Sequence, residues 1–97
     1  MAKRKQKQSK DVKWAEGGER MARTRAAFDL NQIDFARKAK IKQSTYNQYE
    51  TGAKRPSVDN AMALCDTYDL TLDWIYRGDP SSLPYKLANT LRELHRK

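Results

Sequence analysis

The stretch QSTYNQYETG, residues 43–52, carries the side chains whose chemistry is easiest to place. On a helix it puts Thr45, Tyr46 and Tyr49 on one side. The other side then holds four uncharged hydrogen-bonding residues: Gln43, Ser44, Asn47 and Gln48. A face that serves only solubility usually carries Lys and Glu, because charges keep a helix hydrated. Amides and hydroxyls form directional hydrogen bonds instead, so we expect this face to recognise a partner.

Catalytic and metal-binding patterns are weak by comparison. His95 is the only histidine and Cys65 the only cysteine, so a metal site or a histidine acid–base pair would lack companions. Asp66, Asp69 and Asp73 are close in sequence, but a predicted helix boundary separates them, which favours solvated or dipole-directed acids. The sequence holds no phosphate-binding glycine loop and no nucleophile motif. We therefore expect no enzymatic activity and no cofactor.

The distribution of charge favours a polyanionic partner. The 97 residues carry a net charge of +8, and residues 1–13 hold six basic side chains against one acidic one. Residues 37–55 also hold six basic side chains, with Glu50 as their only acid, whereas residues 56–83 hold one arginine and five aspartates. The segment with the polar face is therefore the positive pole of the body. Residues 1–18 are predicted to form a basic, disordered arm.

Five short helices are predicted to position these residues, which gives an all-α domain over residues 19–79. The first is expected over Glu19–Phe28, after a hinge at Gly17 and Gly18. Ala36 is small enough to let a second helix cross closely. The ends of the later helices are marked by predicted N-caps and by a left-handed glycine: Asn31, Gly52, Ser57 and Thr71.

Residues 80–97 add a sixth, amphipathic helix that begins near Pro84. Its apolar stripe consists of leucines at intervals of 4, 4 and 3 residues: Leu83, Leu87, Leu91 and Leu94. Such a stripe needs a partner, and two interpretations stay open. It either contacts a second copy of the chain or packs on the chain's own first and fifth helices.

Residues 19–79 resemble the helix-turn-helix domain of the lambda-repressor-like family, which includes Cro, the phage repressors and the XRE regulators. The resemblance rests on features in matching order: NQ opening the second helix, Ala36 at the close crossing, YETG closing the third helix, RPS opening the fourth and LDWIYRGD as the fifth. It implies a compact five-helix domain that binds double-stranded DNA. It also implies a homodimer that reads a palindromic operator and represses transcription.

The resemblance gives a role to most of the polar residues. The third helix would lie in the major groove, with base contacts from its outer face: Gln43, Ser44, Asn47 and Gln48. Phosphate contacts would come from the start of the second helix and from the positive pole: Gln32, Lys42, Lys54 and Arg55. Arg25 and Glu50 are expected to form a structural ion pair that fixes the angle of the third helix.

Three residues depart from the family pattern. Lys40 stands where the turn usually has glycine, so a left-handed backbone there would cost about 1 kcal/mol. Tyr46 and Tyr49 replace aliphatic residues on the inner side of the third helix. Their hydroxyls therefore need hydrogen-bond partners or an outlet to solvent.

A protein-interaction module of the same fold, such as an antitoxin or an antiactivator bound to a partner protein, is the alternative function. The basic residues that flank the third helix favour DNA, because a protein-only role does not require them. The single cysteine fits a reducing cytoplasm, and the sequence has neither a signal peptide nor a membrane-spanning apolar run. We expect a cytoplasmic protein that associates with the nucleoid when it binds DNA.

Overall fold

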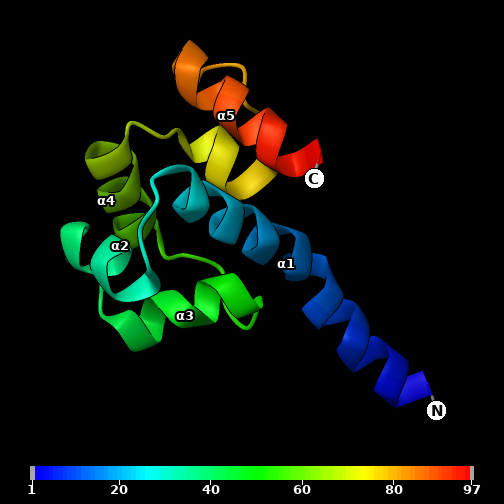
Figure 1. Cartoon of the computed structure of the whole chain (residues 1–97). Coiled ribbons are helices and arrows are strands. Elements are labelled where there is room, and N and C mark those ends of the chain that lie inside the picture. The colour runs from blue at the N-terminus through cyan, green and yellow to red at the C-terminus, as the bar shows by residue number, and fades with distance from the viewer. Residues whose placement is uncertain (1, 97) are drawn as a thin grey trace.

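The computed structural model describes the backbone of residues 2–96 and the side chains of residues 14–95. Within these residues the chain is entirely helical, which confirms the predicted fold class. The elements in chain order are α1 (Ala2–Ala27), α2 (Gln32–Lys38), α3 (Gln43–Thr51), α4 (Val58–Tyr68), the short π-helical turn η1 (Asp73–Arg77) and α5 (Tyr85–Arg96). Figure 1 shows α2, α3 and α4 gathered around one end of α1, with η1 and α5 on the other side of that helix.

The predicted helix ends are confirmed by their hydrogen bonds. The side chain of Asn31 accepts from the backbone N–H of Asp34 at 2.8 Å. Ser57 and Thr71 accept in the same way from residues 60 and 74, at 3.1 and 3.0 Å. Gly52 ends α3 with a φ of 84°, a left-handed conformation that glycine adopts at little cost. The sequence pattern therefore located the start or stop of four elements correctly.

The N-terminal boundary differs from the expected one. The first helix was predicted to start at Glu19 after a glycine hinge, but α1 is continuous from Ala2 through both glycines to Ala27. Gly18 has a packing role instead of a hinge role, because a Cβ atom on it would collide with the backbone carbonyl oxygen of Glu50. It lets α1 and α3 approach each other at backbone level, whereas a Cβ atom on Gly17 would meet the Trp14 ring of the same helix. The side chains of residues 1–13 lie outside the described part of the chain, so the role of this basic segment stays a prediction.

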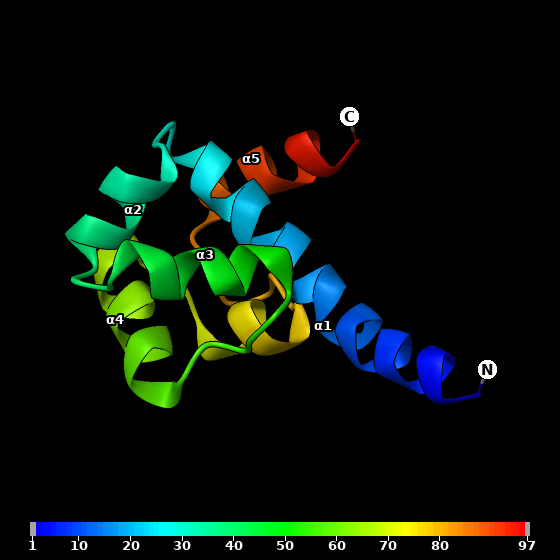
Figure 2. The same ribbon diagram turned by 90° about the horizontal axis from the view of Figure 1, so that it is seen from below.

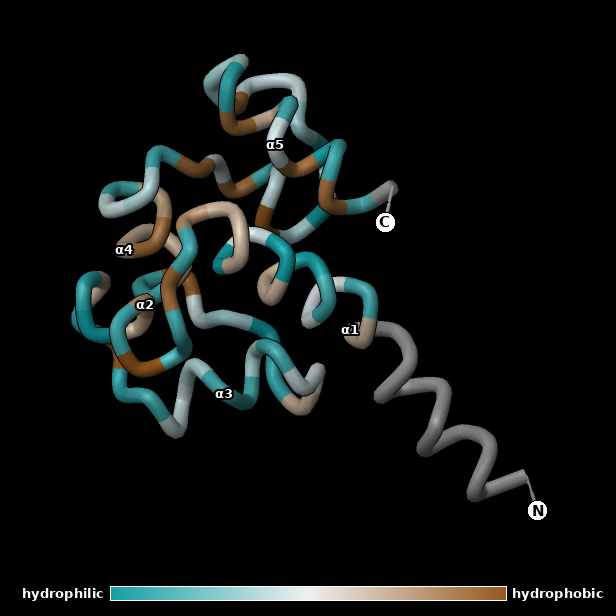
Figure 3. The backbone as a smooth tube through the Cα atoms, in the orientation of Figure 1, coloured by the Kyte–Doolittle hydropathy of each residue, from teal (hydrophilic) through white to brown (hydrophobic). Residues whose placement is uncertain are grey.

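Aromatic residues form the centre of the core. The rings of Phe35 and Tyr68 stack with centroids 4.2 Å apart, and the ring of Tyr46 lies 5.3 Å from Phe35. The hydroxyl of Tyr68 donates to the carbonyl of Phe35 at 2.7 Å, so its polar end is satisfied within the core. Ala36 is fully buried, as the expected close helix crossing requires. In Figure 3 hydrophobic colour concentrates in α4 and in the chain leading to η1, whereas α3 is mostly hydrophilic.

The turn between α2 and α3 contains the expected left-handed lysine. Lys40 has a φ of 60°, and its backbone N–H donates to the carbonyl of Arg37 at 2.9 Å. A non-glycine residue in this conformation costs about 1 kcal/mol. The next backbone N–H, that of Ile41, donates to Ala36 at 2.9 Å, and the Ile41 side chain is buried. The hydrogen bonds and the buried side chain hold the turn in spite of the strain.

The leucine stripe of α5 packs on the chain's own body. Leu83 and Leu91 are buried in the main core, and Leu87 packs against it with partial exposure. The contacts of α5 are made with α1, as Figure 1 also shows. Of the two interpretations of the stripe, packing on the chain's own helices accounts for these three leucines. Leu94, the fourth leucine of the stripe, is partly exposed.

Candidate nucleic-acid interface

The outer face of α3 is open to a partner. α3 lies along the lower side of the molecule in Figure 1 and faces the viewer in Figure 2, with no other helix over it. Gln43 and Ser44 are exposed, and Asn47 and Gln48 are partly exposed. The inner face is formed by two buried tyrosines, 46 and 49. The structure thus brings the four predicted base-contact residues together on one accessible surface, while their contact with bases stays a prediction.

Two glutamines link the start of α3 to the start of α2. The side-chain amide of Gln43 donates to the amide oxygen of Gln32 at 3.0 Å. The amide nitrogen of Gln32 in turn donates to Oε1 of Glu50 at 3.0 Å. Gln32 was expected to touch a phosphate, and this geometry leaves one of its two amide N–H bonds free for that purpose. The exposed Gln43 is therefore oriented by a chain of hydrogen bonds that reaches into the protein.

Glu50 is the centre of this network. Nε of Arg25 donates to Oε2 of Glu50 at 2.7 Å, and a second guanidinium nitrogen donates to Oε1 at 3.1 Å. A third nitrogen of Arg25 donates to the carbonyl of Leu30 at 3.0 Å. The two residues expected as an ion pair thus form a bidentate one, and the side chain of Glu50 is only 7% exposed.

A third donor to Glu50 was missed by sequence reasoning. The hydroxyl of Tyr46, one turn earlier on α3, donates to Oε2 of Glu50 at 2.5 Å. The spacing of four residues along a helix was the available signal, since side chains at i and i+4 face each other. The other tyrosine of the inner face, Tyr49, accepts from the amide of Asn60 on α4 at 2.8 Å. We call the set Arg25, Gln32, Gln43, Tyr46 and Glu50 the α3 array.

The pKa values in the α3 array follow from these contacts. Burial acts to raise the pKa of Glu50, but the hydrogen bonds from Arg25, Tyr46 and Gln32 outweigh it and lower the pKa. Burial, with the negative charge of Glu50 beside it, raises the pKa of Tyr46. At neutral pH Glu50 is therefore an anion and Tyr46 a neutral donor, the protonation states that the hydrogen bonds require.

The predicted phosphate-contact lysines flank α3. Lys42 is exposed immediately before the helix, and Lys54 is exposed just after it, with its backbone N–H donating to Gln48 at 3.2 Å. Arg55 is also exposed, but its guanidinium lies 5.6 Å from the centroid of the Trp14 ring on α1. The structure thus places the two lysines at opposite ends of α3. Arg55 is directed to a different neighbour.

Among the side chains of residues 14–95 no three His, Cys, Asp or Glu residues lie together in a way that could hold a metal ion. None of the helices in the described part of the chain combines the length and apolar character needed to cross a lipid bilayer.

Two short helices joined by a tight turn, with the second helix exposed and held from below by an arginine–glutamate pair, define a helix-turn-helix domain. The sequence profile of the helix-turn-helix family matches residues 21–75, and the chain belongs to this family, of the XRE type. It is also similar to the uncharacterized HTH-type transcriptional regulator YobD of Bacillus subtilis (strain 168), with 33% identity over 57 residues. That alignment covers 59% of this chain and 51% of the relative, so the chain spans about half the length of the relative. No solved structure matches the chain.

Proposed function

We propose that this chain is a sequence-specific DNA-binding transcriptional regulator that places α3 in the major groove. The observation that carries the proposal is the connection from Gln43 through Gln32 to Glu50 and Arg25. It fixes an exposed amide before any partner arrives, and a side chain held in this way loses less conformational entropy on binding. A face that served only solubility would not require such support.

The proposed contacts divide into two kinds. Gln43, Asn47 and Gln48 have the amide groups that pair with adenine edges, and Ser44 has a hydroxyl that suits several bases. Phosphates would be held by Lys42 and Lys54 at the two ends of α3, by Gln32 at the start of α2, and by Arg55. These phosphate contacts fix the position of the domain, whereas the amide contacts select the sequence.

We infer further that the regulator works as a homodimer on a palindromic operator and represses transcription by occupying it. Two copies of α3 would then enter successive major grooves about 34 Å apart. Because the leucine stripe of α5 faces the chain's own core, the second copy would contact another surface. Sedimentation of the purified protein, with and without operator DNA, tests this part of the proposal.

A selection from random oligonucleotides tests the function itself. Purified protein would select DNA at near-physiological salt, and the best site would be titrated against a scrambled duplex. We expect a palindromic winner bound at least about a thousandfold more tightly than the scramble. Weak, salt-sensitive and sequence-blind binding would contradict the proposal. It would favour the alternative of a protein-interaction module.

The basic N-terminal segment gives a second test of DNA binding. Removing residues 1–13 should weaken operator binding and flatten its dependence on salt, by about 0.9 in the log–log slope for each phosphate that the segment neutralises. An unchanged slope would show that the six basic residues of this segment stay away from the DNA.

A further inference from the structure

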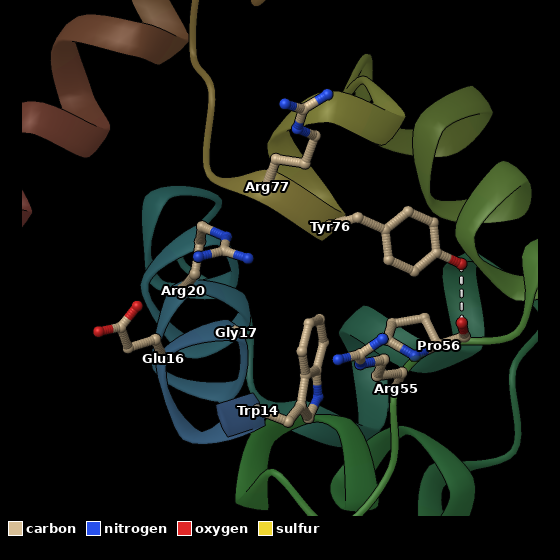
Figure 4. Close-up of a pocket in the computed structure, with 8 residues that line it drawn as sticks. All are labelled: Trp14, Glu16, Gly17, Arg20, Arg55, Pro56, Tyr76 and Arg77. Atoms are coloured by element: carbon tan, nitrogen blue, oxygen red, sulfur yellow. Dashed lines mark hydrogen bonds between the residues drawn. The ribbon is translucent and has the colours of Figure 1, made fainter. Parts of the chain in front are cut away.

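A cavity of about 360 Å³ lies on the side of α1 that faces η1. Figure 4 shows its walls: Arg20 comes from α1, Arg55 and Pro56 follow α3, and Tyr76 and Arg77 belong to η1. The ring of Trp14 forms the floor. We call it the arginine cavity. It is separate from the outer face of α3 and from every residue of the α3 array.

Positive charge dominates the arginine cavity. Its lining contains three arginines, Arg20, Arg55 and Arg77, and one acid, Glu16. The salt bridges among the described side chains are Arg25–Glu50 and Arg37–Asp34, so none of the three forms a salt bridge with a carboxylate of residues 14–95. Glu16 and Asp79 interact electrostatically with Arg20 and Arg77 without such a bridge. Figure 4 shows Arg20 and Arg55 approaching the space above Trp14 from opposite sides, while the carboxylate of Glu16 points away from it.

Arg20 is the best positioned of the three. One of its nitrogens donates to the carbonyl of Ile75 at 3.0 Å, and its guanidinium lies 5.9 Å from the ring centroid of Trp74. These contacts hold the guanidinium in place and leave most of its five N–H donors unused. Its Nε is buried without a hydrogen-bond partner among the described groups. Burial, and after it the charge of Arg23, lower the pKa of Arg20, and the charge of Glu16 offsets this only in part, so a further anion beside Arg20 would be favourable.

We propose that the arginine cavity binds the phosphate group of a small phosphorylated molecule. Guanidinium groups pair with phosphate through parallel hydrogen bonds, and two of them converge on this space from separate elements. The volume lies within the usual range of small-molecule sites, so it accommodates a phosphate with an organic group attached. The rings of Trp14 and Tyr76 supply apolar surface for that group.

Anion binding in the arginine cavity should compete with DNA binding, an inference that rests on the proposed function. Arg55 lines the cavity and is also a proposed phosphate contact on DNA. One guanidinium cannot serve both partners equally well, so the small anion and the DNA backbone compete for it. By linkage, the anion lowers the affinity for DNA by the same factor by which DNA lowers the affinity for the anion.

Two indole signals make the binding step testable, because the chain has only two tryptophans, at positions 14 and 74. Pyrophosphate is the probe, titrated at constant ionic strength against chloride while the indole N–H signals are followed by NMR. Trp14→Phe assigns the signals by removing one of them. We expect a saturable shift of the Trp14 signal and, because Arg20 also lies near the Trp74 ring, a smaller shift of the Trp74 signal that saturates at the same concentration. Equal, non-saturating shifts of both signals would overturn the proposal.

Charge-matched variants locate the site. Arg20→Gln and Arg55→Gln should each weaken pyrophosphate binding by about tenfold or more, because each removes a charged hydrogen-bond donor that faces the cavity. Arg92→Gln makes the same charge change at an exposed position on α5 and should leave the affinity unaltered. Arg55 is exposed, so its variant keeps the fold even if the Arg20 variant does not. Equal weakening by all three variants would mean general charge attraction and would overturn the site.

Operator binding in the presence of pyrophosphate tests the cavity site and the proposed regulatory function separately. Pyrophosphate should weaken operator binding more than chloride of equal ionic strength, and Arg55→Gln should abolish the difference. If a short random duplex moves the Trp14 signal and pyrophosphate does not, the cavity belongs to the DNA interface and the small-anion proposal fails. If the indole shift saturates but no operator is found, the cavity site stands and the proposed regulatory function fails.

Discussion

The α3 array and the arginine cavity both hold arginine beside an aromatic side chain, but they satisfy it in opposite ways. In the array, Arg25 meets a carboxylate that two further side chains also contact, through Tyr46 and Gln32. In the cavity, the guanidiniums of Arg20 and Arg55 flank an open space and form no salt bridge with a carboxylate of the described residues. A charge that is fully paired fixes a structure, whereas a charge that is left available attracts a ligand. Arginine thus positions the outer face of α3 in one region, and in the other it provides the proposed anion site.

The largest loss of stability should come from removing the cation of the Arg25–Glu50 ion pair. Arg25→Met leaves Glu50 largely buried without its cation, which should lower the free energy of unfolding by about 3 kcal/mol. Arg37→Met is the matched control, because it removes a salt bridge to Asp34 whose side chains are 70% and 43% exposed. The control should cost less than about 1 kcal/mol. Urea unfolding measures both, and similar losses would show that the array is not special.

A smaller effect is expected from deleting single hydroxyls on the inner face of α3. Tyr46→Phe removes a donor to the anionic Glu50 and should cost about 2 kcal/mol. Tyr49→Phe removes the acceptor of the Asn60 amide, a neutral contact, and should cost about 1 kcal/mol. Both variants keep the ring in the core. Operator titration should show reduced sequence discrimination for the first variant alone, and the reverse order would contradict the role of the array.

Acid should weaken the array but not the cavity. Because the pKa of Glu50 is lowered in the folded protein, its contribution to stability is complete above the pKa of an unfolded carboxylate, about 4.3. It is lost as the pH falls through the folded value. The free energy of unfolding should therefore decline below about pH 5, and Arg25→Met should decline less steeply, since its Glu50 has lost a stabilising donor. Parallel curves for the two proteins would contradict this assignment.

The smallest effect is expected in the cavity. Arg55→Gln breaks no salt bridge within the described residues and removes only the contact of its guanidinium with the Trp14 ring, so the free energy of unfolding should fall by about 0.5 kcal/mol. Pyrophosphate should raise the melting temperature of the unaltered protein and not that of Arg55→Gln, because a ligand stabilises only the state that binds it. A large loss of stability without ligand would show that Arg55 has a structural role and would remove the contrast with the array.

Local signals in the sequence were sufficient for most of the fold. Asn31, Ser57 and Thr71 cap their helices through hydrogen bonds that span three residues, and Gly52 stops α3 through its own backbone conformation. Such features depend on neighbours along the chain, so a pattern of residue types predicts them. The polar face of α3 was equally visible, because it follows from helical periodicity.

The features that were missed depend on distant residues. A pair of glycines weakens a helix when considered alone, but Gly18 lies against the backbone of Glu50, more than thirty positions away in sequence. The arginine cavity combines residues 14, 20, 55 and 77, whose proximity follows only from the packed fold. The Tyr46–Glu50 bond was within reach of the sequence, since its spacing is local. Its contribution to stability could not be judged from the sequence, because that depends on the burial of Glu50.

One consequence of the array concerns how this protein can change over evolutionary time. Among the described residues, the side chains of Ser44, Asn47 and Gln48 make no hydrogen bond within the protein, whereas Gln43 is tied to Gln32. Mutations at the first three positions can alter the proposed base-contact face and leave stability nearly untouched, so these positions can change without loss of the fold. A change at Gln43 disturbs its support as well and calls for a compensating change at Gln32. The surface therefore has three independent positions and one coupled pair through which descendants of this sequence can acquire new specificities.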